Sequence, residues 1–189
     1  ILGVISGLTP VIAQLHGAGR ADKVGAIVKQ GFYWAAALAA LFIAAGYALV
    51  PLILPQLALE PRVEGITRDY LQAVSFGIVP VFLAAVLRNF IEAHGYTRTS
   101  MGITLVTVPV NIACNYVLMY GLFGLPAFGG AGAGIGSAIT FLLSLLLYSI
   151  VVTHVSPFRE YRIFHRLPRP DFAAWKKQLG VGIPIGSTM

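Results

Sequence analysis

Long apolar stretches separated by short polar segments dominate the chain. Four of them reach the length of about 20 residues that an α-helix needs to cross about 30 Å of hydrocarbon. Arg88 is the only charged residue inside the four, which cover residues 31–54, 70–90, 101–121 and 133–153. The pattern predicts an all-α protein, a polytopic bundle of transmembrane helices.

Both ends of the sequence are apolar as well. Residues 1–15 and 179–189 carry no charge, and the first segment lacks the basic start and cleavage site of a signal peptide. We therefore expect a piece of a longer membrane protein. Its expected parts are a partial N-terminal transmembrane lobe at 1–155, a basic cytoplasmic linker at 156–178, and the start of a C-terminal lobe at 179–189.

Charge is scarce and unevenly distributed. Only 11% of the residues are charged and 57% are hydrophobic, whereas soluble domains carry about 25% charged residues. All Lys and Arg except Arg62 and Arg68 lie in or beside alternate loops. The positive-inside rule then predicts that residues 16–30, 91–100 and 156–178 are cytoplasmic. We expect an inner-membrane protein, and the net charge of +6 therefore does not indicate a nucleic-acid partner.

Polar side chains recur at helical spacing in the last two apolar stretches. At 100° per residue, four positions spaced by 3, 4 and 4 fall within an arc of about 80° on one face of a helix. The two sets with this spacing are Thr104, Thr107, Asn111 and Asn115, then Ser137, Thr140, Ser144 and Tyr148. A short connection makes the two helices antiparallel neighbours, so we expect Asn115 and Ser137 at similar depths.

Two interpretations of these polar stripes stay open. Unsatisfied polar groups in hydrocarbon are costly, so the stripes either bond neighbouring helices together or face water, an ion or a ligand. Asn111 and Asn115 can offer carbonyl oxygens to a cation, but an amide does not titrate. Coupling to protons would therefore need a carboxylate from another part of the protein.

Two further features have structural interpretations. The glycine-rich segment at 129–136 lacks the G-x-G-x-x-G spacing of nucleotide-binding loops, so Gly132-x-x-x-Gly136 predicts close helix packing instead. Arg88 and Glu92 are placed for an ion pair one helical turn apart.

No metal or catalytic site is expected from the remaining chemistry. His16, His94, His154 and His165 are scattered without the spacing of metal ligands. Cys114 is the only cysteine, so neither a disulfide nor a cysteine-based metal site is possible within the chain.

Several segments resemble the multidrug and toxic compound extrusion (MATE) family, in its NorM-like branch. They are SGLTPVIAQLHGAGR, LRNFIEAHGYTRTSM, VPVNIACNYVLMYGLFGLPAFGGAGAGIGSAIT and the basic, proline-containing linker. The resemblance covers nearly the whole chain. It is most specific in the helix with Asn111-x-x-x-Asn115 and the glycine-rich turn that follows.

The resemblance implies a fold and a function. Family members have twelve helices in two six-helix lobes, so the chain would run from the middle of helix 2 to the start of helix 7, covering most of one lobe. Members exchange Na+ or H+ for organic cations and other drugs. The chain is then expected to be no enzyme and to need no cofactor beyond the coupling ion. Its expected partners are small organic cations or drugs, the lipid bilayer and the remainder of the same transporter.

The resemblance also implies site residues. The family's cation site in this lobe combines a helix 1 carboxylate with a polar pair on helix 5, here Asn111 and Asn115, and a helix 6 hydroxyl, here Ser137. Some members have Asp and Thr where this chain has Asn115 and Ser137, which leaves the coupling ion open. The other stripe hydroxyls are expected to face the substrate path, namely Thr104, Thr107, Thr140 and Ser144.

Two alternative functions remain. A lipid-linked oligosaccharide flippase of the same superfamily would have a larger basic cavity. A non-transporting membrane scaffold would have both polar stripes sealed against other helices.

Overall fold

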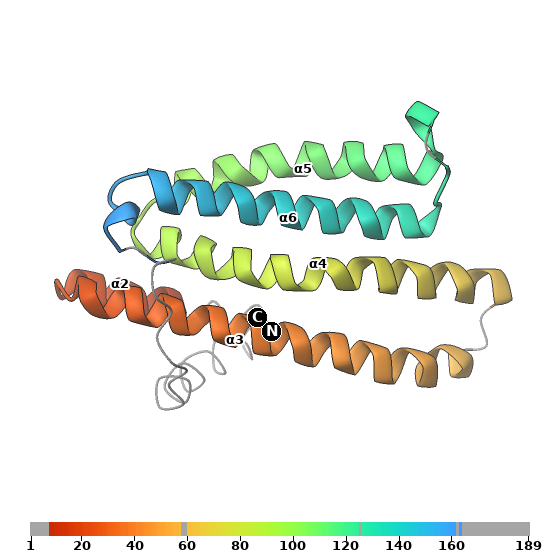
Figure 1. Cartoon of the computed structure of the whole chain (residues 1–189), viewed down its shortest axis with the longest axis horizontal. Coiled ribbons are helices and arrows are strands. Elements are labelled where there is room, and N and C mark those ends of the chain that lie inside the picture. The colour runs from red at the N-terminus through yellow and green to blue at the C-terminus, as the bar shows by residue number, and fades with distance from the viewer. Residues whose placement is uncertain (1–7, 58–59, 125, 162, 164–189) are drawn as a thin grey trace. The chain divides into compact units, whose positions relative to one another are not determined.

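Four long helices form the chain in the computed structural model, which describes residues 8–57, 60–124, 126–161 and 163. They are α3 (Ala21–Ile53), α4 (Pro61–Ala93), α5 (Thr97–Tyr120) and α6 (Gly130–His154) (Figure 1). Each is long and apolar enough to cross a membrane. The predicted all-α class with transmembrane helices is confirmed, and each predicted apolar stretch lies largely within one of these helices.

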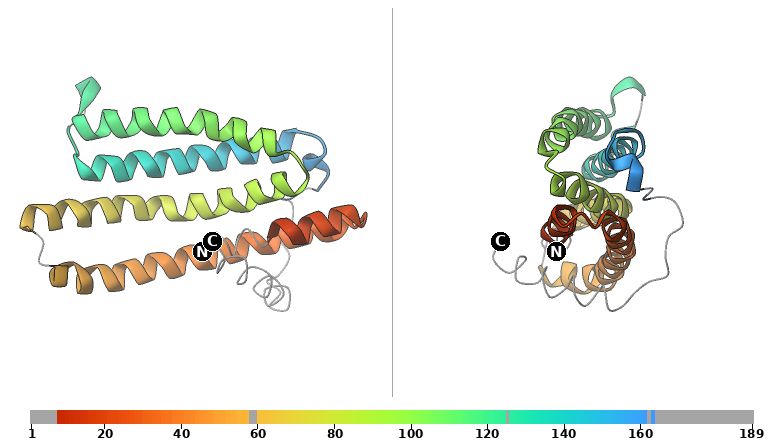
Figure 2. Two further views of the ribbon diagram at one scale, coloured as in Figure 1. Left: turned by 180° about the vertical axis from the view of Figure 1, so that it is seen from behind. Right: turned by 90° about the vertical axis from the view of Figure 1, so that its left-hand side faces the viewer.

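Shorter helical elements begin and connect the long ones. They are α2 (Leu8–Gly17) and three 3₁₀ turns: η1 (Leu54–Leu57), η2 (Leu122–Gly124) and η3 (Phe158–Tyr161). Figure 2 gives two further views of these elements. The predicted C-terminal lobe start at 179–189 and most of the predicted linker at 156–178 lie outside the described residues.

The helices extend beyond the apolar stretches, so the predicted loop bounds are too wide. Residues 21–30, predicted as part of a loop, form the first turns of α3, and only residues 94–96 separate α4 from α5. The physical reason is that hydropathy marks the part of a helix that lies in hydrocarbon. A helix continues into water, where its charged side chains are solvated and its backbone hydrogen bonds persist.

The C-termini of α2 and α4 are closed by the same turn. Gly19 and Gly95 have φ angles of 70° and 83°, which glycine adopts without steric cost. In each turn the glycine N–H donates to the carbonyl three residues earlier, and the next N–H donates to the carbonyl five residues earlier. These bonds define the Schellman motif, and they hold His16 and His94 at the ends of their helices.

The chain divides into two compact units, each containing parts of the four long helices. Unit 1 comprises Ile1–Ala37, Phe82–Ile103 and Leu145–Met189, and unit 2 comprises Leu38–Val81 and Thr104–Ser144. Among the described residues, the nine largest fully buried side chains all belong to unit 1. Unit 1 therefore holds most of the hydrophobic core, whereas unit 2 contains the predicted polar stripes except Tyr148.

Candidate functional site

Within unit 2, α5 and α6 approach closely at two glycines of α6. A Cβ atom at Gly132 would stand 2.6 Å from the backbone carbonyl of Leu118, and one at Gly136 would stand 3.0 Å from the backbone nitrogen of Asn115. Neither position leaves room for a side chain. The predicted close packing at Gly132 and Gly136 is confirmed. Figures 1 and 2 show α5 and α6 side by side.

Hydrogen bonds connect the two polar stripes at this contact. The buried hydroxyl of Thr140 donates to the carbonyl of Gly136 at 2.8 Å and accepts the side-chain amide of Asn111 at 3.2 Å. The carbonyl oxygen of Asn111 accepts the side-chain amide of Asn115, also at 3.2 Å. The bonds therefore run in one direction, from Asn115 through Asn111 on α5 to Thr140 and the carbonyl of Gly136 on α6.

One acceptor at this contact has no hydrogen bond. The side-chain carbonyl oxygen of Asn115 (Oδ1) is buried and has no hydrogen-bond partner among the described residues. It faces Gly136, because a Cβ atom added there would collide with it. An unsatisfied buried acceptor costs about 1–3 kcal/mol, and carbonyl oxygens are ligands that hard cations take. The arrangement therefore offers an unoccupied oxygen to a cation or a proton donor.

The hydroxyl that α6 brings to Asn111 differs from the one selected from sequence. Ser137 is half-buried on α6, and within the described residues no hydrogen bond joins it to Asn111 or Asn115. Thr140, three residues later, bonds Asn111 instead. Sequence spacing does not separate the two because residues three apart lie on the same face of a helix.

Two other stripe hydroxyls, those of Thr107 and Ser144, bond within their own helices. Thr107 donates to the carbonyl of Thr104 at 3.2 Å, and Ser144 donates to the carbonyl of Thr140 at 2.9 Å. Thr107 is buried and Thr104 is exposed. These bonds remove any need for a ligand at Thr107 and Ser144, and their place in a substrate path stays a prediction.

The predicted ion pair on α4 is present. The guanidinium of Arg88 donates to Glu92 at 2.8 Å. Glu92 also accepts the hydroxyl of Ser100 at 2.8 Å, in the first turn of α5. This carboxylate therefore stabilises the connection between α4 and α5 within unit 1.

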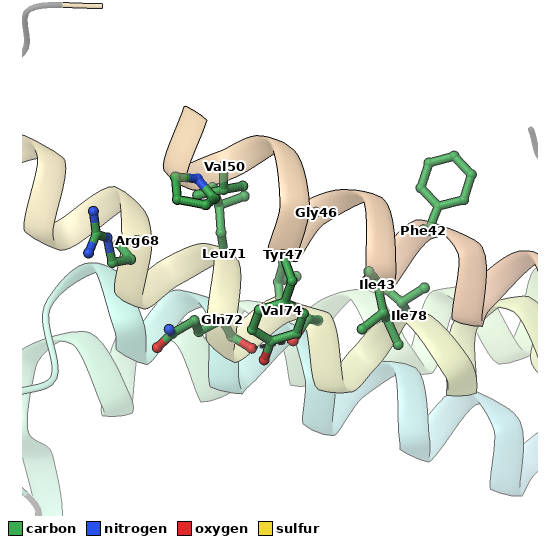
Figure 3. A pocket seen from close by; sticks show the side chains of 12 residues that line it. Phe42, Ile43, Gly46, Tyr47, Val50, Arg68, Leu71, Gln72, Val74 and Ile78 are labelled. Atoms are coloured by element: carbon green, nitrogen blue, oxygen red, sulfur yellow. Dashed lines mark hydrogen bonds between the residues drawn. The ribbon is translucent and has the colours of Figure 1, made fainter. Parts of the chain in front are cut away.

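A cavity of about 240 Å³ in unit 2, between α3 and α4, was not predicted from the sequence (Figure 3). Its lining is mostly apolar, with polar side chains at Tyr47, Arg68, Gln72 and Ser75. Among the described residues, none of the four predicted substrate-path residues lines it. Gly46 also lines the cavity, and a Cβ atom at this position would meet nothing within 4 Å.

A contact between two histidines was not predicted either. His16 and His94 were expected to be scattered, but their ring centroids lie 4.4 Å apart in unit 1. Each histidine precedes a glycine turn at the end of its helix, but no sequence pattern indicates that the two helix ends meet.

Comparisons with known proteins identify the family. A family model described as MatE matches residues 1–117. The chain is 42% identical over 187 residues to the "Probable multidrug resistance protein NorM" of Geobacillus kaustophilus, covering 99% of the chain and 41% of that relative. A protein of the same name from Bacillus thuringiensis is 40% identical over 98% of the chain and 41% of its own length. The chain thus spans about two fifths of the length of these relatives.

A solved structure supports the same assignment. The chain resembles the MATE transporter NorM-NG, solved in complex with a ligand and a monobody, with a TM-score of 0.66 and 25% identity over 97% of the chain and 40% of that structure. The matched family model covers more than half of the chain, from residue 1 to residue 117 near the end of α5. With its apolar helices and its NorM relatives, the chain belongs to the MatE family of multi-pass membrane proteins, in the branch of the NorM multidrug resistance proteins.

Proposed function

We propose that the protein containing this chain is a multidrug efflux antiporter that exchanges Na+ or H+ for small organic cations or drugs. The names of its NorM relatives support drug efflux, and the solved neighbour is a MATE transporter with a bound ligand. In this proposal the protein lies in the inner membrane with residues 16–30, 91–100 and 156–178 on the cytoplasmic side. Transport follows alternating access, with no enzymatic step.

The unpaired carbonyl oxygen of Asn115 is the observation that carries the cation site. It is buried at a contact too tight for a side chain at Gly136, and Asn111 next to it is held by Thr140. A cation bound to this oxygen would satisfy it, and a carboxylate from outside the chain would supply the charge. Thr140 joins Ser137 as a candidate for the hydroxyl on α6.

The flippase alternative has less support. A lipid-linked oligosaccharide with its phosphates would need a basic cavity. The cavity in the described part of unit 2 has one basic residue in its lining, Arg68, and Glu64 pairs with it at 3.1 Å. We therefore favour cations and drugs over lipid-linked anions as cargo.

A transport assay on the full-length protein tests the proposal. Purified protein in liposomes is given an imposed Na+ or H+ gradient, and the movement of ethidium, a fluorescent organic cation, is followed by its emission. We expect transport by the wild type, and its loss in the double variant Asn111→Ala/Asn115→Ala. Thr153→Ala is the matched control, because that hydroxyl bonds carbonyls of its own helix.

The outcomes separate the site from the function. Normal coupled transport by the double variant would overturn the site assignment. Wild-type protein that moves ethidium under neither gradient, although correctly folded by size-exclusion chromatography, would contradict the antiport proposal for that substrate.

A further inference from the structure

Two histidines, each at the end of a helix of unit 1, contact the hydroxyl oxygen of a tyrosine in a third element of that unit. The hydroxyl of Tyr161, in η3, lies 2.9 Å from Nε2 of His94 at the end of α4 and 3.2 Å from Nδ1 of His16 in the last turn of α2. These contacts join residues up to 145 positions apart. Neither the family comparison nor the proposed transport mechanism uses this cluster.

Aromatic packing fixes the cluster in place. Phe90 and Phe158 are fully buried, and both rings stand edge-on to His94, with centroids 4.6 Å and 5.6 Å away. The carbonyl of Tyr161 packs against α3, 3.4 Å from the position of a Cβ atom at Gly25. The η3 turn is therefore seated on α2, α3 and α4 rather than loosely attached.

The hydrogen bonds fix where the protons lie when both histidines are neutral. Nδ1 of His94 is 2.8 Å from the carbonyl of Phe90, which can only accept, so Nδ1 carries the hydrogen. Nε2 of His94 is then an acceptor and receives the Tyr161 hydroxyl hydrogen. The Tyr161 oxygen accepts in turn from Nδ1–H of His16, so every group has a partner.

One added proton keeps all three groups bonded. If it binds at Nε2 of His16, Nδ1–H of His16 still donates to the Tyr161 oxygen, and the hydroxyl still donates to Nε2 of His94. A second proton makes both histidines donors to the same oxygen. The hydroxyl hydrogen then has no acceptor in the cluster, and two cations face each other with ring centroids 4.4 Å apart.

We propose that His16, Tyr161 and His94 form a proton-binding site that holds at most one proton, and that a second proton releases η3 from α2 and α4. The site is thus a pH-sensitive latch on the segment that begins the linker after α6.

Charged side chains of both signs lie on the elements around the cluster. Glu92 on α4 is engaged by Arg88 and Ser100. Glu160 is the carboxylate on η3, next to Tyr161. The elements that surround the cluster carry five further titratable side chains. They are Arg20 in the turn after α2, Lys23 and Lys29 on α3, Tyr96 after α4 and Arg159 on η3. Most of them are cationic, and a second proton adds to this positive charge.

The directions in which the pKa values of His94 and Tyr161 are shifted agree with this arrangement of hydrogen bonds. Burial lowers the pKa of His94, the hydrogen bond to the Phe90 carbonyl opposes this, and the charge of His16 lowers it further. Burial, and then the charge of Glu160, raise the pKa of Tyr161. The hydroxyl therefore keeps its hydrogen while His94 resists protonation.

Hydrogen–deuterium exchange on the full-length protein in lipid nanodiscs tests the latch. The backbone amides of residues 158–161 are compared at pH 7.5 and pH 5.5, after correction for the intrinsic pH dependence of exchange. We expect slow exchange at pH 7.5 and exchange at least about tenfold faster at pH 5.5. Equal protection at the two pH values would overturn the proposal without any variant.

Two variants sharpen the test. Tyr161→Phe removes the shared oxygen, and we expect fast exchange at both pH values. His154→Gln is the matched control, because His154 bonds only within the end of α6 and should keep the wild-type pH response. A Tyr161→Phe protein that is as protected as the wild type at pH 7.5, or a His154→Gln protein that loses the pH response, would overturn the assignment.

Discussion

The side-chain amide of Asn111 donates to the hydroxyl of Thr140, 3.2 Å away, and joins α5 to α6 by a hydrogen bond between side chains. The bond lies where Gly136 brings the helix backbones together. It orients Asn111 so that its own carbonyl oxygen receives the amide of Asn115. The direction of the whole chain of bonds therefore depends on one hydroxyl group.

Thr140→Val should destabilise the contact between α5 and α6. The substitution keeps the shape of the side chain but leaves the Asn111 amide without its acceptor, at a cost of about 1–3 kcal/mol. Thr140→Ser retains the hydroxyl and should lose much less. Thermal unfolding of the full-length protein in detergent measures the difference, and Thr153→Val, at an exposed hydroxyl bonded within its own helix, is the control. Equal unfolding midpoints for Thr140→Val and wild type would show that the bond contributes nothing.

Gly136→Ala should disrupt the same contact through the backbone. The added methyl group would collide with the side-chain carbonyl oxygen of Asn115 and would stand 3.0 Å from its backbone nitrogen. Gly102→Ala, on α5, would meet nothing within 4 Å, and replacing a mid-helix glycine there should stabilise by roughly 0.5–1 kcal/mol. Opposite shifts of the unfolding midpoint are expected, and a Gly136→Ala protein as stable as Gly102→Ala would contradict the close approach.

The sequence predicts the helices well because hydrocarbon thickness dictates their apolar length. It also predicts Gly132 and Gly136 as a packing site, since only small residues allow backbones to approach. The partner of Asn111 cannot be chosen in this way. Ser137 and Thr140 share one helix face, and their relative rotation toward α5 depends on tertiary packing.

Contacts between distant segments are the other limit of prediction from sequence. His16 and Tyr161 meet although 145 residues separate them, and no periodicity in a single helix encodes such a contact. The cavity between α3 and α4 is similar, because its lining comes from two helices. Helical periodicity identifies the residues that share one face of a helix, whereas tertiary packing determines which residues that face contacts.

Phe158→Ala should remove the main apolar anchor of η3. The ring is 1% exposed and packs against Phe90 with centroids 5.5 Å apart, so its loss should cost about 3–5 kcal/mol. Phe123→Ala is the matched control, because that ring is 91% exposed and should change stability little. The unfolding midpoints of the two purified variants provide the measurement, and similar midpoints would contradict the assignment of Phe158 to the core.

The stability of the protein should fall between pH 7.5 and pH 5.5 in a way that depends on His94. Burial lowers the pKa of this imidazole in the folded protein, whereas the unfolded value is about 6.5. Between the two values the unfolded chain binds more protons than the folded one, so acidification favours unfolding. The loss begins as the pH falls through about 6.5 and levels off below the pKa of the folded state. His94→Gln, which does not titrate, should flatten the dependence of the unfolding midpoint on pH, while His154→Gln should leave it unchanged. An unaltered slope in His94→Gln would mean that another group carries the dependence, whereas a flattened slope would trace it to the imidazole that bonds Tyr161.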